Sequence, residues 1–210
     1  LPAQRPRRLG DRAPRALTGP DPTVPLNLFL IRHAHAVTAE ENPERPLSER
    51  GRADTQRIAA FFRTNGLLHP AQLWHSPLLR SRETAEALDQ ALLLDAVRVE
   101  IPGLLPEDDP EALVQRLAEY PATHDIALVG HEPHLSALAT WLVRDKPKPV
   151  IFHLRKGAVL ALERTEAVHK QSGLPRWQVR WHFSPELITR FIGSAVALSP
   201  AASGATPPSP

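Results

Sequence analysis

An arginine and a histidine that can act together on a phosphoryl group follow an apolar run near the start of the chain. Arg32 and His33 come directly after Leu28-Phe29-Leu30-Ile31. Arginine offers a planar set of donors that fits phosphate oxygens, and histidine can attack phosphorus and carry the phosphoryl group. Open α/β sheets bind ligands at the carboxyl ends of their strands. The pair therefore predicts a phosphate site at such an edge, although a single strand-end histidine is more often structural.

Two later strand ends carry residues of the same kind. Arg80 lies in the stretch 76–80 after the second predicted strand, and His131 follows Gly130 after the fourth. The carboxyl ends of parallel strands meet at one edge of a sheet, so these residues are expected to converge with the first pair on one anion. Gly130 lets the backbone turn tightly there. The predicted catalytic set is Arg32, His33, Arg80 and His131, with both arginines and His131 binding the substrate.

The segments that must position these residues alternate between strand and helix. Short apolar runs predict strands, and helical spacing of apolar residues with capping residues predicts helices. The predicted strands are 26–31, 72–75, 97–101, 125–129, 157–163 and 177–183. The predicted helices are 49–65, 82–92, 110–120 and 134–143. This alternation predicts an α/β three-layer sandwich with a mostly parallel sheet, helices on both faces and an antiparallel last pair of strands.

The length of 210 residues predicts one domain with tails. Residues 1–25 are rich in Pro and Arg without periodicity, and residues 199–210 are small and uncharged, so both are expected to be disordered. The domain is then 26–198. The net charge is +2, and residues 1–25 hold five Arg against two Asp, so the domain itself is close to neutral.

Composition excludes several classes of protein. The absence of cysteine rules out disulfides, thiol catalysis and a cysteine metal site. No run approaches the roughly 20 apolar residues of a membrane span. The basic N-terminus is not followed by an apolar segment, so no secretory signal is expected. We therefore expect a cytoplasmic protein that binds neither membrane nor nucleic acid.

The motifs resemble those of the histidine phosphatase superfamily, also called phosphoglycerate-mutase-like. The similar segments are Arg32-His33-Ala34, Ser76-Pro77-Leu78-Leu79-Arg80 with Glu83-Thr84-Ala85, and Gly130-His131. The stretch Arg45-Pro46-Leu47-Ser48-Glu49-Arg50-Gly51-Arg52 resembles the bacterial SixA-type phosphohistidine phosphatases. The likeness spans about residues 26–190.

The resemblance implies a phosphatase with His33 as the nucleophile, which forms a phosphohistidine intermediate that water then hydrolyses. Arg32 and Arg80 would lower the pKa of His33 and bind the equatorial phosphoryl oxygens. His131 would stabilise the transferring group. No metal or other cofactor is implied. The substrate would be phosphohistidine in a protein or a small phosphorylated molecule.

The sequence departs from the superfamily pattern at two places. Ala34 stands where glycine is usual, which is acceptable if its φ is negative. Mutase-like members carry a glutamate as general acid after the third strand, and here only Glu107, in a loop of acidic residues and prolines, is a candidate. An imidazole leaving group departs neutral without a strong acid if its other nitrogen is already protonated, so this departure favours phosphohistidine as substrate.

Two alternatives use the same residues differently. The first is a small-molecule phosphate monoesterase of the same superfamily, with Glu107 as acid. The second is a metallohydrolase with histidine ligands drawn from His33, His35, His131 and His134. The nearby arginines would repel a divalent cation, and His35 is expected to lie at the rim of the site.

Overall fold

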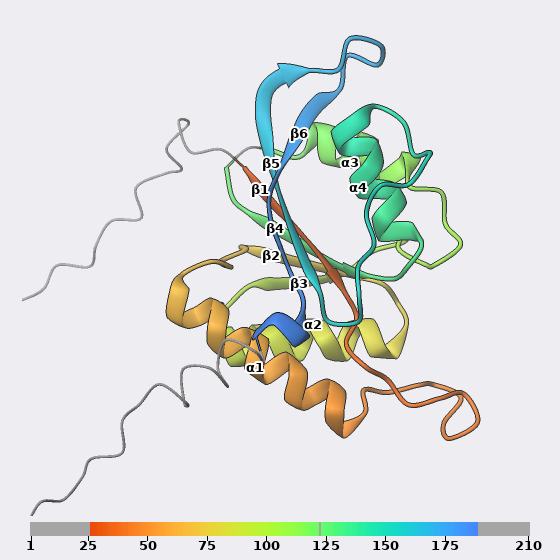
Figure 1. The fold of residues 1–210 in the computed structure, drawn as a ribbon, viewed down its shortest axis with the longest axis vertical. Coiled ribbons are helices and arrows are strands. Elements are labelled where there is room, and N and C mark those ends of the chain that lie inside the picture. Colours follow the sequence, from red (N-terminus) through yellow and green to blue (C-terminus); the bar gives the residue numbers. More distant parts are fainter. Residues whose placement is uncertain (1–25, 122, 189–210) are drawn as a thin grey trace, which may run out of the picture.

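The structure of the chain is a computed structural model, which describes residues 26–121 and 123–188 (Figure 1). The predicted tails, 1–25 and 199–210, lie outside the described residues, as do residues 189–198. The domain boundaries at 26 and 198 therefore stay predictions.

Six strands form one mixed sheet in the order β3-β2-β4-β1-β5-β6. They are β1 (Asn27–Arg32), β2 (Gln72–His75), β3 (Val97–Glu100), β4 (Ile126–Gly130), β5 (Val159–Val168) and β6 (Pro175–Phe183). The pairs β3–β2, β2–β4 and β4–β1 are parallel, whereas β1–β5 and β5–β6 are antiparallel. The predicted mostly parallel sheet with an antiparallel last pair is confirmed.

Among the described residues the helices α1 to α4 cover the two faces of the sheet, which makes three layers (Figure 1). They are α1 (Glu49–Asn65), α2 (Leu79–Leu92), α3 (Glu111–Glu119) and α4 (His134–Arg144). The buried apolar side chains of α1 and α2 belong to one core, and those of α3 and α4 belong to the other. Strand β1 contributes Leu28 and Leu30 to the second core and Phe29 and Ile31 to the first.

The apolar sequence of β1 follows from this position between two helical layers. Its four apolar side chains are at most 3% exposed. A strand covered on both faces needs a continuous apolar run rather than an alternating one. Burying one such side chain contributes about 1.5–3 kcal/mol, so this strand is a fixed base for the residues that follow it.

The helix α1 has the ends that the sequence predicts. The Ser48 hydroxyl accepts a hydrogen bond from the Gly51 N–H at 3.1 Å, and Gly66 ends the helix with a φ of 61°. At α3 the prediction was wrong by one residue, since the helix begins at Glu111 and Pro110 is the capping residue. Asp109 still caps this end, because its Oδ1 accepts from the Glu111 N–H at 2.9 Å.

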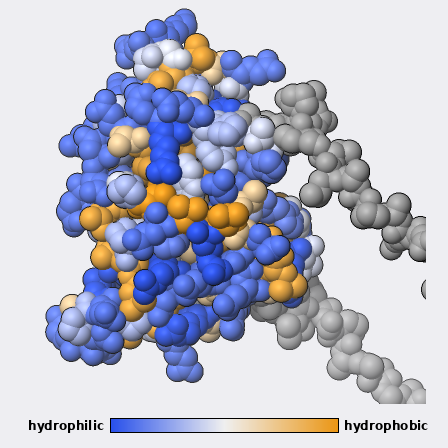
Figure 2. Space-filling model, turned by 180° about the vertical axis from the view of Figure 1, so that it is seen from behind, coloured by the Kyte–Doolittle hydropathy of each residue, from blue (hydrophilic) through white to orange (hydrophobic). Residues whose placement is uncertain are grey.

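The surface seen from behind is mostly hydrophilic, with apolar side chains gathered in a short band across its middle (Figure 2). Within the described part of the chain no helix is both long and apolar enough to cross a membrane.

Candidate active site

The ends of three parallel strands lie level at one edge of the sheet. Arg32, the last residue of β1, pairs with Gly130 at the end of β4, and Val129 pairs with both Ile31 and His75. The residues that follow these strands therefore begin at the same edge of the sheet, as the sequence predicts. They include His33, His131 and the segment that leads into α2.

His33 is buried, and backbone carbonyl groups of other residues hold its N–H and its ring. Its N–H donates to the Gly130 carbonyl at 2.9 Å, and its ring Nδ1 lies 2.7 Å from the Ala34 carbonyl oxygen. A carbonyl oxygen only accepts, so Nδ1 carries the proton of the neutral ring and Nε2 keeps its lone pair. Burial above all, with smaller effects of His131, Arg80 and Arg32, lowers the pKa of His33 to about 3, although the hydrogen bond to Ala34 acts to raise it. The ring is thus neutral near pH 7, with Nε2 as its nucleophilic atom.

His131 lies beside His33, with ring centroids 5.0 Å apart. Its Nε2 lies 2.9 Å from the Ser76 hydroxyl, which accepts from the Leu78 N–H at 3.3 Å. Among the described residues the Ser76 proton has no other acceptor, so it is donated to Nε2 and the ring proton stays on Nδ1. Burial, followed by the charge of Arg80, lowers the pKa of His131 to about 3.

Arg32 and Arg80 bring two positive charges to the same place. One end of the Arg32 guanidinium donates to the Leu154 carbonyl at 2.8 Å, which fixes its orientation. Burial lowers the pKa of both groups, but a guanidinium stays protonated near neutral pH. Both charges lower the pKa of His33 and of His131. The structure therefore brings the four predicted residues together.

Three buried nitrogen atoms around His33 have no hydrogen-bond partner among the described residues. They are Nε of Arg32, Nε of Arg80 and Nδ1 of His131. A buried donor without a partner costs about 1–3 kcal/mol, and native proteins hold few of them. His131 contacts the His33 ring and the charges of Arg32 and Arg80 act on it, so the three residues that carry these donors form a cradle for an anion beside His33.

The motif that follows Arg80 ties α2 to the residue after His33. The Thr84 hydroxyl donates to the Arg80 carbonyl at 2.6 Å and accepts from the Ala34 N–H at 3.0 Å. Ala34 is not among the residues with a positive φ, so alanine fits where the superfamily has glycine. The Glu83 carboxylate accepts from the Leu47 N–H at 2.6 Å and joins the loop before α1 to α2.

Sequence reasoning missed Arg45, which lies in the loop between β1 and α1. Its Nε donates to the Val37 carbonyl at 3.3 Å, and its charge lowers the pKa of Arg80 and of His131. In the sequence, Arg45 belongs only to the stretch 45–52 that resembles SixA-type proteins. No periodicity in this loop indicates that it folds back over the site, so only that resemblance pointed to it.

Two carboxylates lie near the cations. Glu107 is exposed, and its charge opposes the lowering of the Arg80 pKa, so it lies on the Arg80 side. Glu132 was missed, and it follows His131 directly. It is half-buried, it accepts from the Ser136 hydroxyl at 2.8 Å, and burial raises its pKa while its charge acts on Arg32.

The remaining histidines of the metallohydrolase alternative are not gathered with His33. His35 is half-buried and its Nδ1 lies 2.8 Å from the Ser48 hydroxyl, on the α1 side of the site. His134 is buried in α4, and neither of its ring nitrogens has a partner among the described residues. In the described ranges no three His, Cys, Asp or Glu side chains are grouped so that they could hold a metal ion.

Comparisons with known proteins agree with this fold and site. The sequence model of the histidine phosphatase superfamily (branch 1) matches residues 28–102. An uncharacterized protein of Picosynechococcus sp. is 30% identical over 164 residues, which cover 72% of this chain and 98% of the relative. The chain belongs to the histidine phosphatase superfamily, and the prediction of a phosphatase is confirmed.

Solved structures share the fold. The protein histidine phosphatase SixA complexed with tungstate is 20% identical, with a TM-score of 0.65, and the match covers 78% of this chain and 99% of that one. The SixA homologue from Agrobacterium tumefaciens is 21% identical, with a TM-score of 0.61 over 78% of this chain and all of that chain. A mycobacterial glucosyl-3-phosphoglycerate phosphatase is 16% identical, with a TM-score of 0.59 over 77% of this chain and 100% of its own. The predicted phosphoglycerate-mutase-like fold is confirmed.

Proposed function

We propose that this phosphatase acts through a phosphohistidine intermediate on His33 and removes phosphate from phosphohistidine in a protein. The observation that carries the proposal is the state of the His33 ring. Its Nδ1 is engaged by the Ala34 carbonyl, so Nε2 is the free nucleophile, and the neighbouring residues Arg32, Arg80 and His131 each carry an unpartnered donor. A phosphoryl group needs both an attacking atom and donors for its equatorial oxygens.

The reaction would proceed in two steps. The Nε2 lone pair attacks phosphorus and the bond from phosphorus to the leaving nitrogen breaks. The substrate ring, whose other nitrogen already carries a proton, departs with the electron pair as neutral imidazole. Arg32, Arg80 and the Nδ1–H of His131 bind the equatorial oxygens in the transition state. Water then attacks the phosphoryl group on His33, which releases inorganic phosphate and returns the neutral ring.

The choice of phosphohistidine rests on the leaving group. Imidazole leaves without a strong acid, whereas an alkoxide needs a proton from a positioned acid. Glu107 is exposed in its loop and makes no hydrogen bond among the described residues, so it is a weak candidate for that role. Similarity to SixA structures supports the same substrate class.

The alternative is a small-molecule monoesterase, and Glu132 favours it. Burial raises the pKa of this carboxyl, which is the direction a general acid needs, and its charge acts on Arg32. Either Glu107 or Glu132 would then protonate the leaving alkoxide. A rate comparison separates the two functions: kcat/KM for a phosphohistidine peptide is expected to exceed that for sugar phosphates, and the reverse order would select the monoesterase.

The substrate would thus be a phosphorylated protein, with neither membrane nor nucleic acid as partner. A cytoplasmic location is proposed from the sequence composition alone.

A further inference from the structure

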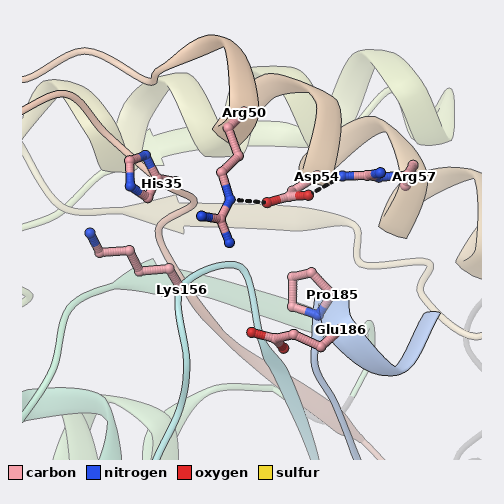
Figure 3. Close-up of a pocket in the computed structure, with 7 residues that line it drawn as sticks. All are labelled: His35, Arg50, Asp54, Arg57, Lys156, Pro185 and Glu186. Carbon is pink, nitrogen blue, oxygen red and sulfur yellow. Dashed lines mark hydrogen bonds and ion pairs between the residues drawn. The ribbon is translucent and has the colours of Figure 1, made fainter. Parts of the chain in front are cut away.

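A second anion-binding feature lies beside the catalytic edge. A hollow of about 360 Å³ is enclosed by the start of α1, the segment after β1, the loop before β5 and the turn after β6 (Figure 3). This volume is within the range of small-ligand sites. Its charged lining consists of the cations Arg50, Arg57 and Lys156 and the carboxylates Asp54 and Glu186.

The two carboxylates already have partners. Asp54 pairs with Arg57 and, at 3.6 Å, with Nε of Arg50. Glu186 pairs with Arg155 at 3.5 Å, outside the hollow. The ammonium of Lys156 makes no hydrogen bond or ion pair with any described residue, and it lies across the hollow from the Asp54 pairs (Figure 3). One positive charge of the lining is therefore left without a counter-ion.

The hollow is joined to the catalytic edge through the backbone. The N–H of Gly157, next to Lys156, donates to the Arg32 carbonyl at 3.1 Å and to the His33 carbonyl at 3.2 Å. His35, two residues beyond His33, lines the hollow from the other side. The charges of Arg32 and Arg80 both act on Lys156. The hollow is therefore built on the segment that follows His33 and on the loop that is hydrogen-bonded to it.

The other wall of the hollow is formed by the first turn of α1, which packs closely against the segment after β1. A Cβ on Gly51 would lie 2.0 Å from the His35 carbonyl oxygen, so only glycine lets the first turn of α1 approach this strand end. The approach places Arg50 next to His35, with its terminal nitrogens toward the hollow (Figure 3). The Ser48 hydroxyl donates to the His35 carbonyl at 3.2 Å and accepts from Nδ1 of His35 at 2.8 Å, so Nε2 of the neutral ring keeps its lone pair and donates nothing into the hollow.

We propose that this hollow binds a second anionic group of the substrate, a carboxylate or phosphate separate from the scissile phosphoryl group. Lys156 is the principal partner, and the terminal nitrogens of Arg50 complete the site. The proposal rests on the proposed function and narrows its substrates to molecules with two separated anionic groups. An acidic side chain near the phosphohistidine of a protein has this chemistry, as does a small phosphate ester with a carboxylate.

Kinetics on two matched substrate pairs test the proposal. One pair is a phosphohistidine peptide flanked by glutamates and its counterpart flanked by glutamines, and the other is a carboxyalkyl phosphate and the alkyl phosphate of equal length. The full chain is expected to favour the more anionic member in kcat/KM by about tenfold in at least one pair, the effect of one hydrogen-bonded charge. A preference for the glutamate-flanked peptide means that the second anionic group belongs to a protein substrate. A preference for the carboxyalkyl phosphate means that it belongs to a small molecule.

The variant Lys156→Ala is expected to reduce that preference to about twofold or less, and Lys156→Glu to reverse it. Lys170→Ala is the matched control, because it removes the same charge from the exposed turn between β5 and β6. Equal kcat/KM within both pairs, or a preference that survives Lys156→Glu, would overturn the proposal.

A binding measurement keeps this inference distinct from the proposed function. Glutarate, titrated into the full chain, is expected to shift the backbone amide NMR signals of His35, Gly51 and Gly157, and Lys156→Ala is expected to abolish the shifts. If no phosphorylated probe is hydrolysed while these shifts occur, the proposed function fails and the anion site stands. If the shifts are absent or survive Lys156→Ala, the anion site is refuted.

Discussion

The hydroxyl of Ser76 lies 2.9 Å from Nε2 of His131, and both side chains are buried. The two residues come from the ends of neighbouring strands, β2 and β4, which pair in parallel. This contact determines which ring nitrogen of His131 carries the proton, and therefore whether Nδ1 donates toward the anion cradle.

Removal of this hydroxyl tests that relationship. Ser76→Ala is expected to lower kcat by about 10- to 100-fold, because loss of one donor in a transition-state cradle has effects up to this order. The ¹⁵N chemical shifts of the His131 ring are expected to report a change of tautomer. Thr55→Val is the control: this buried hydroxyl donates to the Gly51 carbonyl at 2.9 Å, within α1, and bonds to neither Ser76 nor His131. An unchanged tautomer and kcat in Ser76→Ala would contradict the account.

The lowered pKa of His33 predicts a loss of stability in acid. This group has a pKa of about 3 in the folded chain and about 6.5 when unfolded, so between these values the unfolded chain binds more protons. Stability therefore rises with pH through this window and is lost as the pH falls from 6.5 toward 3. From pH 7 to pH 5, His33 is expected to account for about 2 kcal/mol of lost unfolding free energy.

Urea unfolding of the wild type and of His33→Asn at both pH values measures this contribution. The variant is expected to lose about 2 kcal/mol less than the wild type over the same interval, because asparagine does not titrate. Equal losses in the two proteins would mean that His33 keeps an ordinary pKa and is not buried as described.

Arg45 is expected to contribute to substrate binding although it lies outside the strand-end motifs. Its charge lowers the pKa of Arg80 and of His131, so it lies close to the cradle. Arg45→Ala is expected to raise KM by about tenfold, as for one charge-assisted hydrogen bond to the phosphoryl group. Arg176→Ala, which removes an exposed arginine from β6, is the control. A normal KM in Arg45→Ala would place this side chain outside the binding site.

Activity is expected to survive exhaustive chelation. The groups around His33 are guanidinium and imidazole donors, which bind phosphoryl oxygens directly. Vanadate is expected to inhibit, because it adopts the five-coordinate geometry of phosphorus in transfer. A loss of activity on chelation that zinc or manganese restores would instead support the metallohydrolase alternative.

The parts of the fold that the sequence predicted are determined by local features of the sequence, such as apolar runs and capping residues. The strands β1 and β4 hold the continuous apolar runs 28–31 and 126–129 because they are covered on both faces, and α1 has a serine cap and a terminal glycine. The start of α2 has no such local feature in the sequence. Its capping residue Leu78 makes no side-chain hydrogen bond, and tertiary contacts such as Ser81 to Val129 fix the first turn. The prediction therefore placed this start three residues late.

The ends of the β5–β6 hairpin were also misplaced. The strands run to Val168 and from Pro175, whereas the predicted strands end at 163 and begin at 177. This end of the hairpin projects beyond the other strands (Figure 1), and residues 166–168 are exposed. An exposed ladder is held by its backbone hydrogen bonds and leaves no apolar pattern to detect.

The candidate site was predictable where it depends on strand ends and unpredictable where it depends on loops. Arg32, His33 and His131 follow strands, so the parallel sheet alone brings them together. Arg45 reaches the site only because its loop folds back, with Ala36 bridged to Leu47. Neither hydrophobic periodicity nor capping residues predict that a loop folds back in this way.

The most direct test of the central claim is to trap the phosphoenzyme. The full chain is mixed with a phosphorylated substrate and quenched in alkaline denaturant within one turnover, and the modified residue is mapped by mass spectrometry. The account predicts phosphate on His33 that is stable to base and labile to acid, and none in His33→Asn. Phosphate on another residue, or full activity in His33→Asn, would contradict it.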